Sequence, residues 1–184
     1  MKNLLAWMET AAILSFNVPV SGGQNDPRLD PLFLALKATV DADEADQLEA
    51  GIWALWGLSG DDEIDQIMTI GINAMGEGDG ETALTAFNEV ISRAPDYAEG
   101  WNKRATLFYL AGEHELAISD IKKTLALEPR HFGAYSGLGL VYMALGEERK
   151  ALDAFENALE IHPHMDGADT HIRELRDIVK GRGV

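Results

Sequence analysis

The apolar residues in the middle of the chain recur at three- and four-residue spacings, which is typical of helices that bury one face. From residue 64 to residue 165 these helical stretches come in pairs, and a proline follows the second helix of each pair. The closing prolines, Pro95, Pro129 and Pro163, are spaced by 34 residues. The pattern therefore predicts one pair of helices that is repeated at a constant period.

Each pair also repeats one order of small and large residues. The unit 98–131 carries Trp101, Ala105, Phe108, Gly112, Ala117 and Ile121, and the next unit carries Tyr135, Leu138, Gly139, Tyr142, Gly146, Ala151 and Phe155. Small residues let the two helices of a unit approach closely, and large ones fill the gap to the next unit. This order, W-x2-L-G-x2-Y, then A-x3-F, then P, resembles the tetratricopeptide repeat family.

The resemblance implies an all-α fold, a right-handed superhelix of helical hairpins. Three repeats are expected over residues 64–97, 98–131 and 132–165, and residues 166–184 are expected to form a helix that covers the last repeat. One repeat cannot bury its apolar face alone, so the stack is the stable object. Arg104 replaces the usual leucine, and its guanidinium is expected to reach a neighbouring acid.

A further helical hairpin is predicted over residues 24–63. On the same 34-residue period, large or charged residues stand where the family has small ones, namely Lys37, Glu49 and Trp56. Terminal repeats are commonly atypical, so we expect this hairpin to be a divergent unit that caps the stack.

Residues 1–23 have the layout of a secretory signal peptide. Lys2 precedes an apolar run that Glu9 interrupts, and small residues up to Gly23 would place a cleavage before Gln24. This layout favours export, for example to the periplasm; the alternative is an uncleaved amphipathic N-terminus and a cytoplasmic protein. The run is too short and too interrupted for a conventional membrane span.

Composition narrows the classes of function. The 184 residues, 46% of them apolar, suit one compact domain, and the absence of cysteine removes disulfides, zinc–thiolate sites and thiol nucleophiles. A net charge of −16, with no basic cluster longer than Lys122–Lys123, argues against nucleic acid as a partner. Residues 24–63 alone carry −8. This acidity is either a solvated surface or a field that steers a basic partner.

The resemblance also implies a function, because tetratricopeptide proteins are scaffolds whose first helices line a concave groove that holds a peptide or a partner helix. The expected groove residues are Met68, Ile72 and Met75 in the first repeat, Asn102, Thr106 and Tyr109 in the second, and Ser136, Leu140 and Met143 in the third. The Asn102 amide can hold a peptide backbone, and methionines give adaptable apolar contacts. In the alternative, a terminal helix packs into the groove and makes these residues core.

One specialisation of the family is not expected. Chaperone-binding members grip a C-terminal carboxylate with lysine, asparagine and arginine side chains at fixed repeat positions. This chain has Met68, Ile72, Lys103, Gly133 and Gly137 there.

The histidines are the remaining candidates for chemistry. His162, His164 and His171 lie close in sequence, but a proline ends a helix between the first two, so neither a metal nor a cofactor is expected. His114 and His131 stand in turns and are expected at the surface. No carboxylate pair is isolated in an apolar setting, so catalysis is not expected.

The sequence thus predicts a non-catalytic adaptor with a protein or peptide partner. The alternatives are a self-assembling structural protein, which would be a homo-oligomer, and a metal-binding protein that uses His162, His164 and His171.

Overall fold

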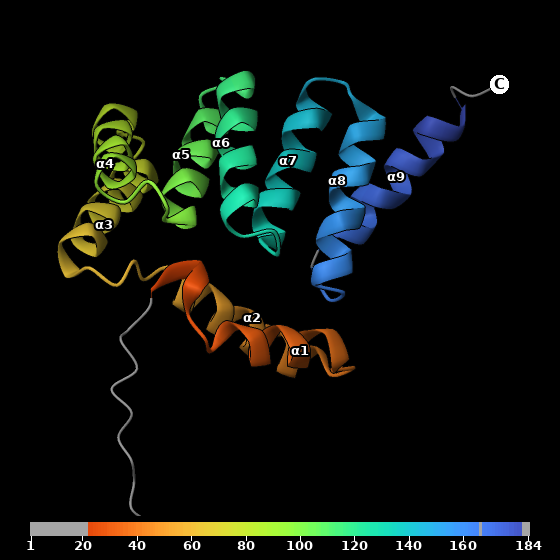
Figure 1. Cartoon of the computed structure of the whole chain (residues 1–184). Helices are drawn as coiled ribbons and strands as arrows, with labels where there is room; N and C mark the ends of the chain where they lie inside the picture. Colours follow the sequence, from red (N-terminus) through yellow and green to blue (C-terminus); the bar gives the residue numbers. More distant parts are fainter. Residues whose placement is uncertain (1–21, 166, 182–184) are drawn as a thin grey trace, which may run out of the picture.

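The computed structural model describes residues 22–165 and 167–181, and throughout this part of the chain the regular structure is helical (Figure 1). The elements are a 3-10 turn η1 (Gly23–Asn25) and the helices α1 (Leu29–Ala38), α2 (Ala42–Trp56), α3 (Asp62–Glu77), α4 (Gly80–Arg93), α5 (Ala98–Leu110), α6 (His114–Leu127), α7 (Phe132–Ala144), α8 (Glu148–Ile161) and α9 (Ala168–Gly181). The predicted signal peptide lies outside the described residues except for Gly22 and Gly23. None of the described helices combines the length and the hydropathy that a membrane crossing needs.

Three helical hairpins, α3–α4, α5–α6 and α7–α8, stand side by side, and α9 packs against α8 (Figure 1). The predicted all-α superhelix of hairpins is confirmed. In each hairpin a glycine with positive φ turns the chain: Gly78 (+80°), Gly112 (+77°) and Gly146 (+70°). Residues with a Cβ rarely adopt this conformation, which explains the return of glycine after each first helix.

The order of small and large residues has the predicted packing role. A Cβ added at Gly71 would lie 2.5 Å from the ring of Phe87, and one at Gly139 would lie 2.7 Å from the ring of Phe155. Both phenylalanines are almost fully buried. Each glycine in a first helix therefore makes room for the aromatic ring of the second helix.

The expectation for Arg104 is confirmed. Its Nε and Nη2 donate to the two carboxylate oxygens of Asp120 at 2.7 and 2.9 Å, and its Nη1 donates to Asn88 Oδ1 at 2.7 Å. Asp120 is buried, so this two-pronged ion pair satisfies a carboxylate that would otherwise lack a partner. Arg104 in α5 thereby joins α6 to α4.

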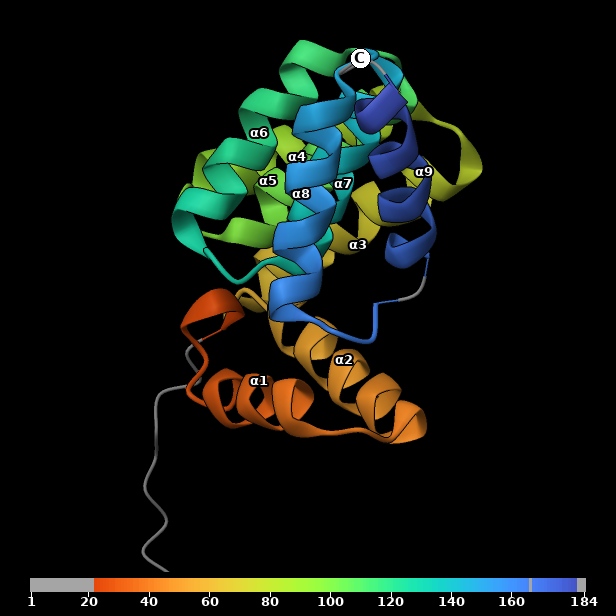
Figure 2. The same cartoon turned by 90° about the vertical axis from the view of Figure 1, so that its right-hand side faces the viewer.

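The N-terminal hairpin α1–α2 forms, but it does not extend the stack as the expected end cap. Figures 1 and 2 show it across the edge of the stack where the loops between repeats lie. Tyr97 Oη donates to Trp56 O at 2.9 Å, and His164 Nε2 lies 3.0 Å from Thr39 O. The hairpin therefore touches the first and the last of these loops.

The residues that break the repeat pattern explain this position. Trp56 stacks on the His131 ring, with centroids 4.1 Å apart and an angle of 9° between the planes. Glu49 Oε2 lies 3.0 Å from His162 Nε2. Phe132, from α7, completes the buried core of the hairpin. Trp56 and Glu49, which replace the small residues of the repeat pattern, thus attach the hairpin to the loops between repeats.

Candidate functional site

A cavity of about 440 Å³ lies over α5 and α7, and we call it the α5–α7 groove. Ser136, Gly137 and Leu140 of α7 face Thr106 and Tyr109 of α5 across it. Glu49 and Trp53 of α2 also line it. The walls are mostly apolar, with a few hydroxyl and amide groups among them, which is the usual make-up of a ligand site.

Five of the nine residues predicted for the groove line this cavity: Asn102, Thr106, Tyr109, Ser136 and Leu140. Their two helices belong to successive repeats, so the 34-residue period places them on one face. Asn102 is only 7% exposed. Its Nδ2 donates to Glu99 Oε2 at 3.0 Å, so part of its amide is already engaged.

The other four predicted residues do not line the cavity. Met68 is 2% exposed and packs in a core cluster with Phe87, Tyr97 and Leu107, so its assignment to the groove is corrected. The reason is that Tyr97, at the end of the same repeat, and Leu107, from the next repeat, pack with it in that cluster. Ile72 is exposed, and Met75 packs partly against the same cluster. Met143 packs partly against a cluster of α8 and α9 residues.

A buried polar network around Glu99, which is 3% exposed, adjoins the groove through Asn102 and Lys103. Its carboxylate lies 2.9 Å from Lys103 Nζ and 3.0 Å from His131 Nε2. His131 Nδ1 accepts a hydrogen bond from Ala134 N at 3.0 Å, so the proton of the ring sits on Nε2 and is donated to Glu99. Burial raises the pKa of Glu99, but the bond from His131 and the charge of Lys103 outweigh it and hold that pKa below its usual range.

The expectation that His131 lies at the surface is wrong, because the residue is fully buried. It caps the start of α7, where an acceptor satisfies an unpaired backbone N–H. Its counterpart one period earlier is Tyr97, which is also buried and also reaches Trp56. His131 stands 34 residues after Tyr97, at the same position of the repeat. This equivalence to a large aromatic residue is the signal in the sequence that indicates burial of His131.

Sequence reasoning missed the contribution of α2. Trp53 Nε1 donates to Glu49 Oε1 at 3.0 Å, which fixes both side chains at the edge of the groove. Gly133 makes room for Trp53, since a Cβ there would lie 2.5 Å from the indole ring. Glu49 and Trp53 thus bring α2 to the edge of the cavity that lies over α5 and α7.

The three C-terminal histidines face different partners. His162 contacts Glu49, and His164 contacts the backbone of Thr39. His171 stacks on Phe155 with ring centroids 4.9 Å apart. Across residues 22–165 and 167–181, no three His, Asp or Glu side chains are grouped as a metal site.

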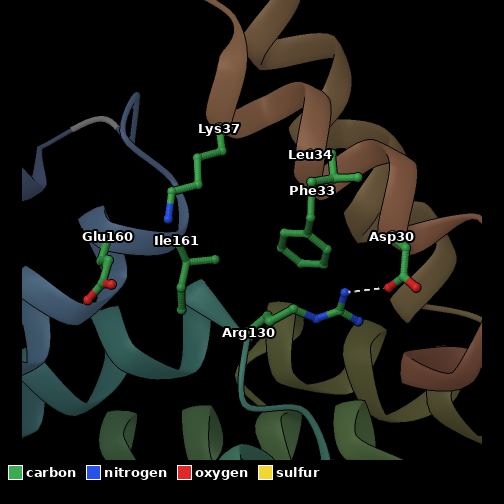
Figure 3. Close-up of a pocket in the computed structure, with 7 residues that line it drawn as sticks. All are labelled: Asp30, Phe33, Leu34, Lys37, Arg130, Glu160 and Ile161. Carbon is green, nitrogen blue, oxygen red and sulfur yellow. Dashed lines mark hydrogen bonds and ion pairs between the residues drawn. The ribbon is translucent and has the colours of Figure 1, made fainter.

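A second cavity, of about 430 Å³, lies between α1, the loop that precedes α7 and the end of α8 (Figure 3). Arg130 donates to Asp30 Oδ1 at 2.7 Å and to both oxygens of Glu128. Its guanidinium also lies over the Phe33 ring, 4.5 Å from the centroid. Through these hydrogen bonds Arg130 attaches α1 to the repeats. The cavity lies along the seam, that is, the line of contact between α1 and the repeats.

The stacked hairpins and their groove define a helical-repeat protein. Two family models, both described as tetratricopeptide repeat, match residues 68–124 and 133–165. The chain is 37% identical over 154 residues to a TPR repeat-containing protein of Rhizobium etli, which covers 84% of this chain and 76% of that protein. The chain belongs to the tetratricopeptide repeat family.

Two solved structures share the fold. The Sgt2 TPR domain of Aspergillus fumigatus has a TM-score of 0.62 at 22% identity, over 66% of this chain and 82% of that domain. The first TPR of Spaghetti (RPAP3), bound to the HSP90 peptide SRMEEVD, has a TM-score of 0.62 at 20% identity, over 65% of this chain and 94% of that one. A further relative, the small glutamine-rich TPR-containing protein 2 of Saccharomyces cerevisiae, is 31% identical over 91 residues, 50% of this chain and 26% of that protein.

Proposed function

We propose that this protein is a non-catalytic adaptor that binds a peptide or a partner helix in the α5–α7 groove. The observation that carries the proposal is the cavity itself, which has Tyr109 and Leu140 as apolar walls and the Ser136 hydroxyl beside them. Such a surface binds an apolar side chain and satisfies part of a peptide backbone.

The solved relatives support a peptide as the class of ligand. The RPAP3 domain is bound to an HSP90 peptide, and the TPR2B domain of yeast Sti1, with a TM-score of 0.59 at 22% identity, is described as a complex with an Hsp70 peptide. Both use the fold of stacked hairpins that this chain has. The partner of this chain is a separate question, because these similarities concern the fold.

The test is to block the groove from an exposed position. Thr106→Trp places an indole in the cavity, and because Thr106 is exposed the substitution should leave the fold intact. Thr69→Trp is the matched control: Thr69 is exposed on α3, away from the cavity, and its hydroxyl bonds the carbonyl four residues back, as that of Thr106 does. Partners captured from native extract are quantified by mass spectrometry.

We expect a specific partner to be captured by the wild type and by Thr69→Trp and to be lost with Thr106→Trp. Equal capture by all three proteins would refute binding in this groove. Light scattering of the purified chain decides the alternative of a self-assembling protein, which would show oligomers without any partner.

We also propose that the chain is exported, on the layout of residues 1–23. Gly22 packs against Ser59 and Gly60, and Gly23 packs against the Tyr97 ring, so a cleavage before Gln24 would remove these contacts. The mass of the mature protein from its native host tests the proposal: an uncleaved chain in the cytoplasm would contradict it.

A further inference from the structure

The two charged side chains that line the α5–α7 groove, Lys103 and Glu49, are not equally available to a ligand. Among the described residues around the cavity, Lys103 is the one cation and Glu49 the one anion. Lys103 Nζ lies 2.9 Å from the buried carboxylate of Glu99 and 5.5 Å from the centroid of the Trp53 ring. Because a fixed carboxylate already neutralises the lysine, Glu49 supplies the charge that a ligand meets.

Glu49 keeps the capacity to bind a cation. Its side chain is 33% exposed, and each of its oxygens has one protein contact, to Trp53 Nε1 or to His162 Nε2. An ionised carboxylate has about four acceptor sites, so each oxygen can accept a further bond from a ligand.

More acids follow toward the C-terminus, on α9. Glu174 and Asp177 of α9 stand one period, 34 residues, after Leu140 and Met143, and both are exposed. The basic residue between them, Arg176, turns to α8 and lies 2.7 Å from Glu156. The whole chain also carries a net charge of −16, which favours a cationic ligand over an anionic one.

Much of the remaining lining of the cavity is apolar. Leu110 lines the cavity and is 66% exposed, and Tyr109 and Leu140, which are half-buried, line it as well. A ligand that matches these features combines apolar side chains with positive charge.

Building on the proposed function, we infer that the α5–α7 groove takes an apolar peptide segment that carries lysine or arginine, with one cation seated at Glu49. An acidic C-terminal tail does not suit it. Such a tail would face Glu49, and it would have to displace Glu99 from Lys103.

The experiment begins with the full chain and a phage library of random 12-residue peptides, with Thr106→Trp as the counter-screen for groove dependence. We expect the peptides that bind the wild type and not Thr106→Trp to be enriched in Lys and Arg beside Leu, Phe or Met. The best of them is synthesised in two forms, the selected one and one with each Lys or Arg replaced by Glu. The peptide SRMEEVD is the acidic reference.

The dissociation constants are measured by fluorescence anisotropy at low and high salt. We expect the Glu-substituted form to bind at least about tenfold more weakly than the basic form, and the affinity of the basic form to fall as salt increases. SRMEEVD should show no groove-dependent binding.

Glu49→Gln keeps an acceptor for Trp53 and removes the charge. It should weaken the basic peptide about threefold to tenfold. Asp46→Asn removes one charge from the same helix at an exposed position outside the cavity, so it should change the affinity less than Glu49→Gln does.

The two proposals fail in different ways. If selected peptides depend on the groove but are acidic, or if SRMEEVD binds as tightly as the basic form, the charge preference is wrong and the groove function stands. If no selected peptide distinguishes the wild type from Thr106→Trp, the groove function is wrong, and the charge preference falls with it.

Discussion

The repeats and the N-terminal hairpin are both pairs of helices, yet they are held by different contacts. The two helices of each repeat pack through small residues set against large apolar rings, such as Gly139 against Phe155. The hairpin instead lies on the loops between repeats through aromatic rings and hydrogen bonds, with Trp56 stacked on His131. Contacts that recur in every repeat thus build the stack. Contacts that occur only once attach the N-terminal hairpin to the edge of the stack.

This difference decides how much the sequence could predict. The repeats were predictable because neighbouring helices are near in sequence and the same residue types return every 34 positions. The docking of the hairpin joins residues that are far apart, such as Glu49 and His162, which are 113 positions apart. No period marks such a pair. The same cause hid the place of Trp53 in the groove.

The candidate groove was predictable in part for the same reason. Asn102, Thr106 and Ser136 lie where the repeat positions place them. Met68 does not, because Tyr97 and Leu107 cover it at the first repeat. Helical periodicity predicts the face of the helix on which a residue lies. It does not predict which neighbouring residues cover that face.

The largest expected effect comes from breaking the stack. Phe155→Ala should lower the free energy of unfolding by about 3–5 kcal/mol, because a fully buried ring is lost and leaves a cavity. Urea unfolding followed by circular dichroism measures it. Leu34→Ala, at a position that is 74% exposed, is the control and should change stability little. A loss below about 1 kcal/mol for Phe155→Ala would show that the stack does not depend on this contact.

A smaller effect is expected from breaking the hairpin contact. Tyr97→Phe removes the donor to Trp56 O and leaves a buried carbonyl unpaired, which should cost about 1–3 kcal/mol. Hydrogen exchange should speed up in α1 and α2 and change little in α6 and α8. Tyr135→Phe, where the phenol makes no comparable bond to the residues that the structure describes, should leave exchange unchanged. Faster exchange throughout the repeats would mean that hairpin and stack unfold as one unit.

The smallest effect concerns pH and lies where the two regions meet. The pKa of Glu99 is lowered in the folded protein, so its contribution to stability is full above the pKa of an unfolded glutamate and is lost as pH falls through the folded value. Stability measured by urea unfolding should therefore decline on the acid side. Glu99→Gln should make this decline shallower. An identical acid slope for the two proteins would show that Glu99 has no such role.

The most direct test of the account is hydrogen exchange of the full chain with a peptide selected for binding at Thr106. The account predicts protection in α5, in α7 and in the part of α2 that contains Glu49 and Trp53. Protection confined to α6 and α8, or to the seam between α1 and the last repeat, would contradict it.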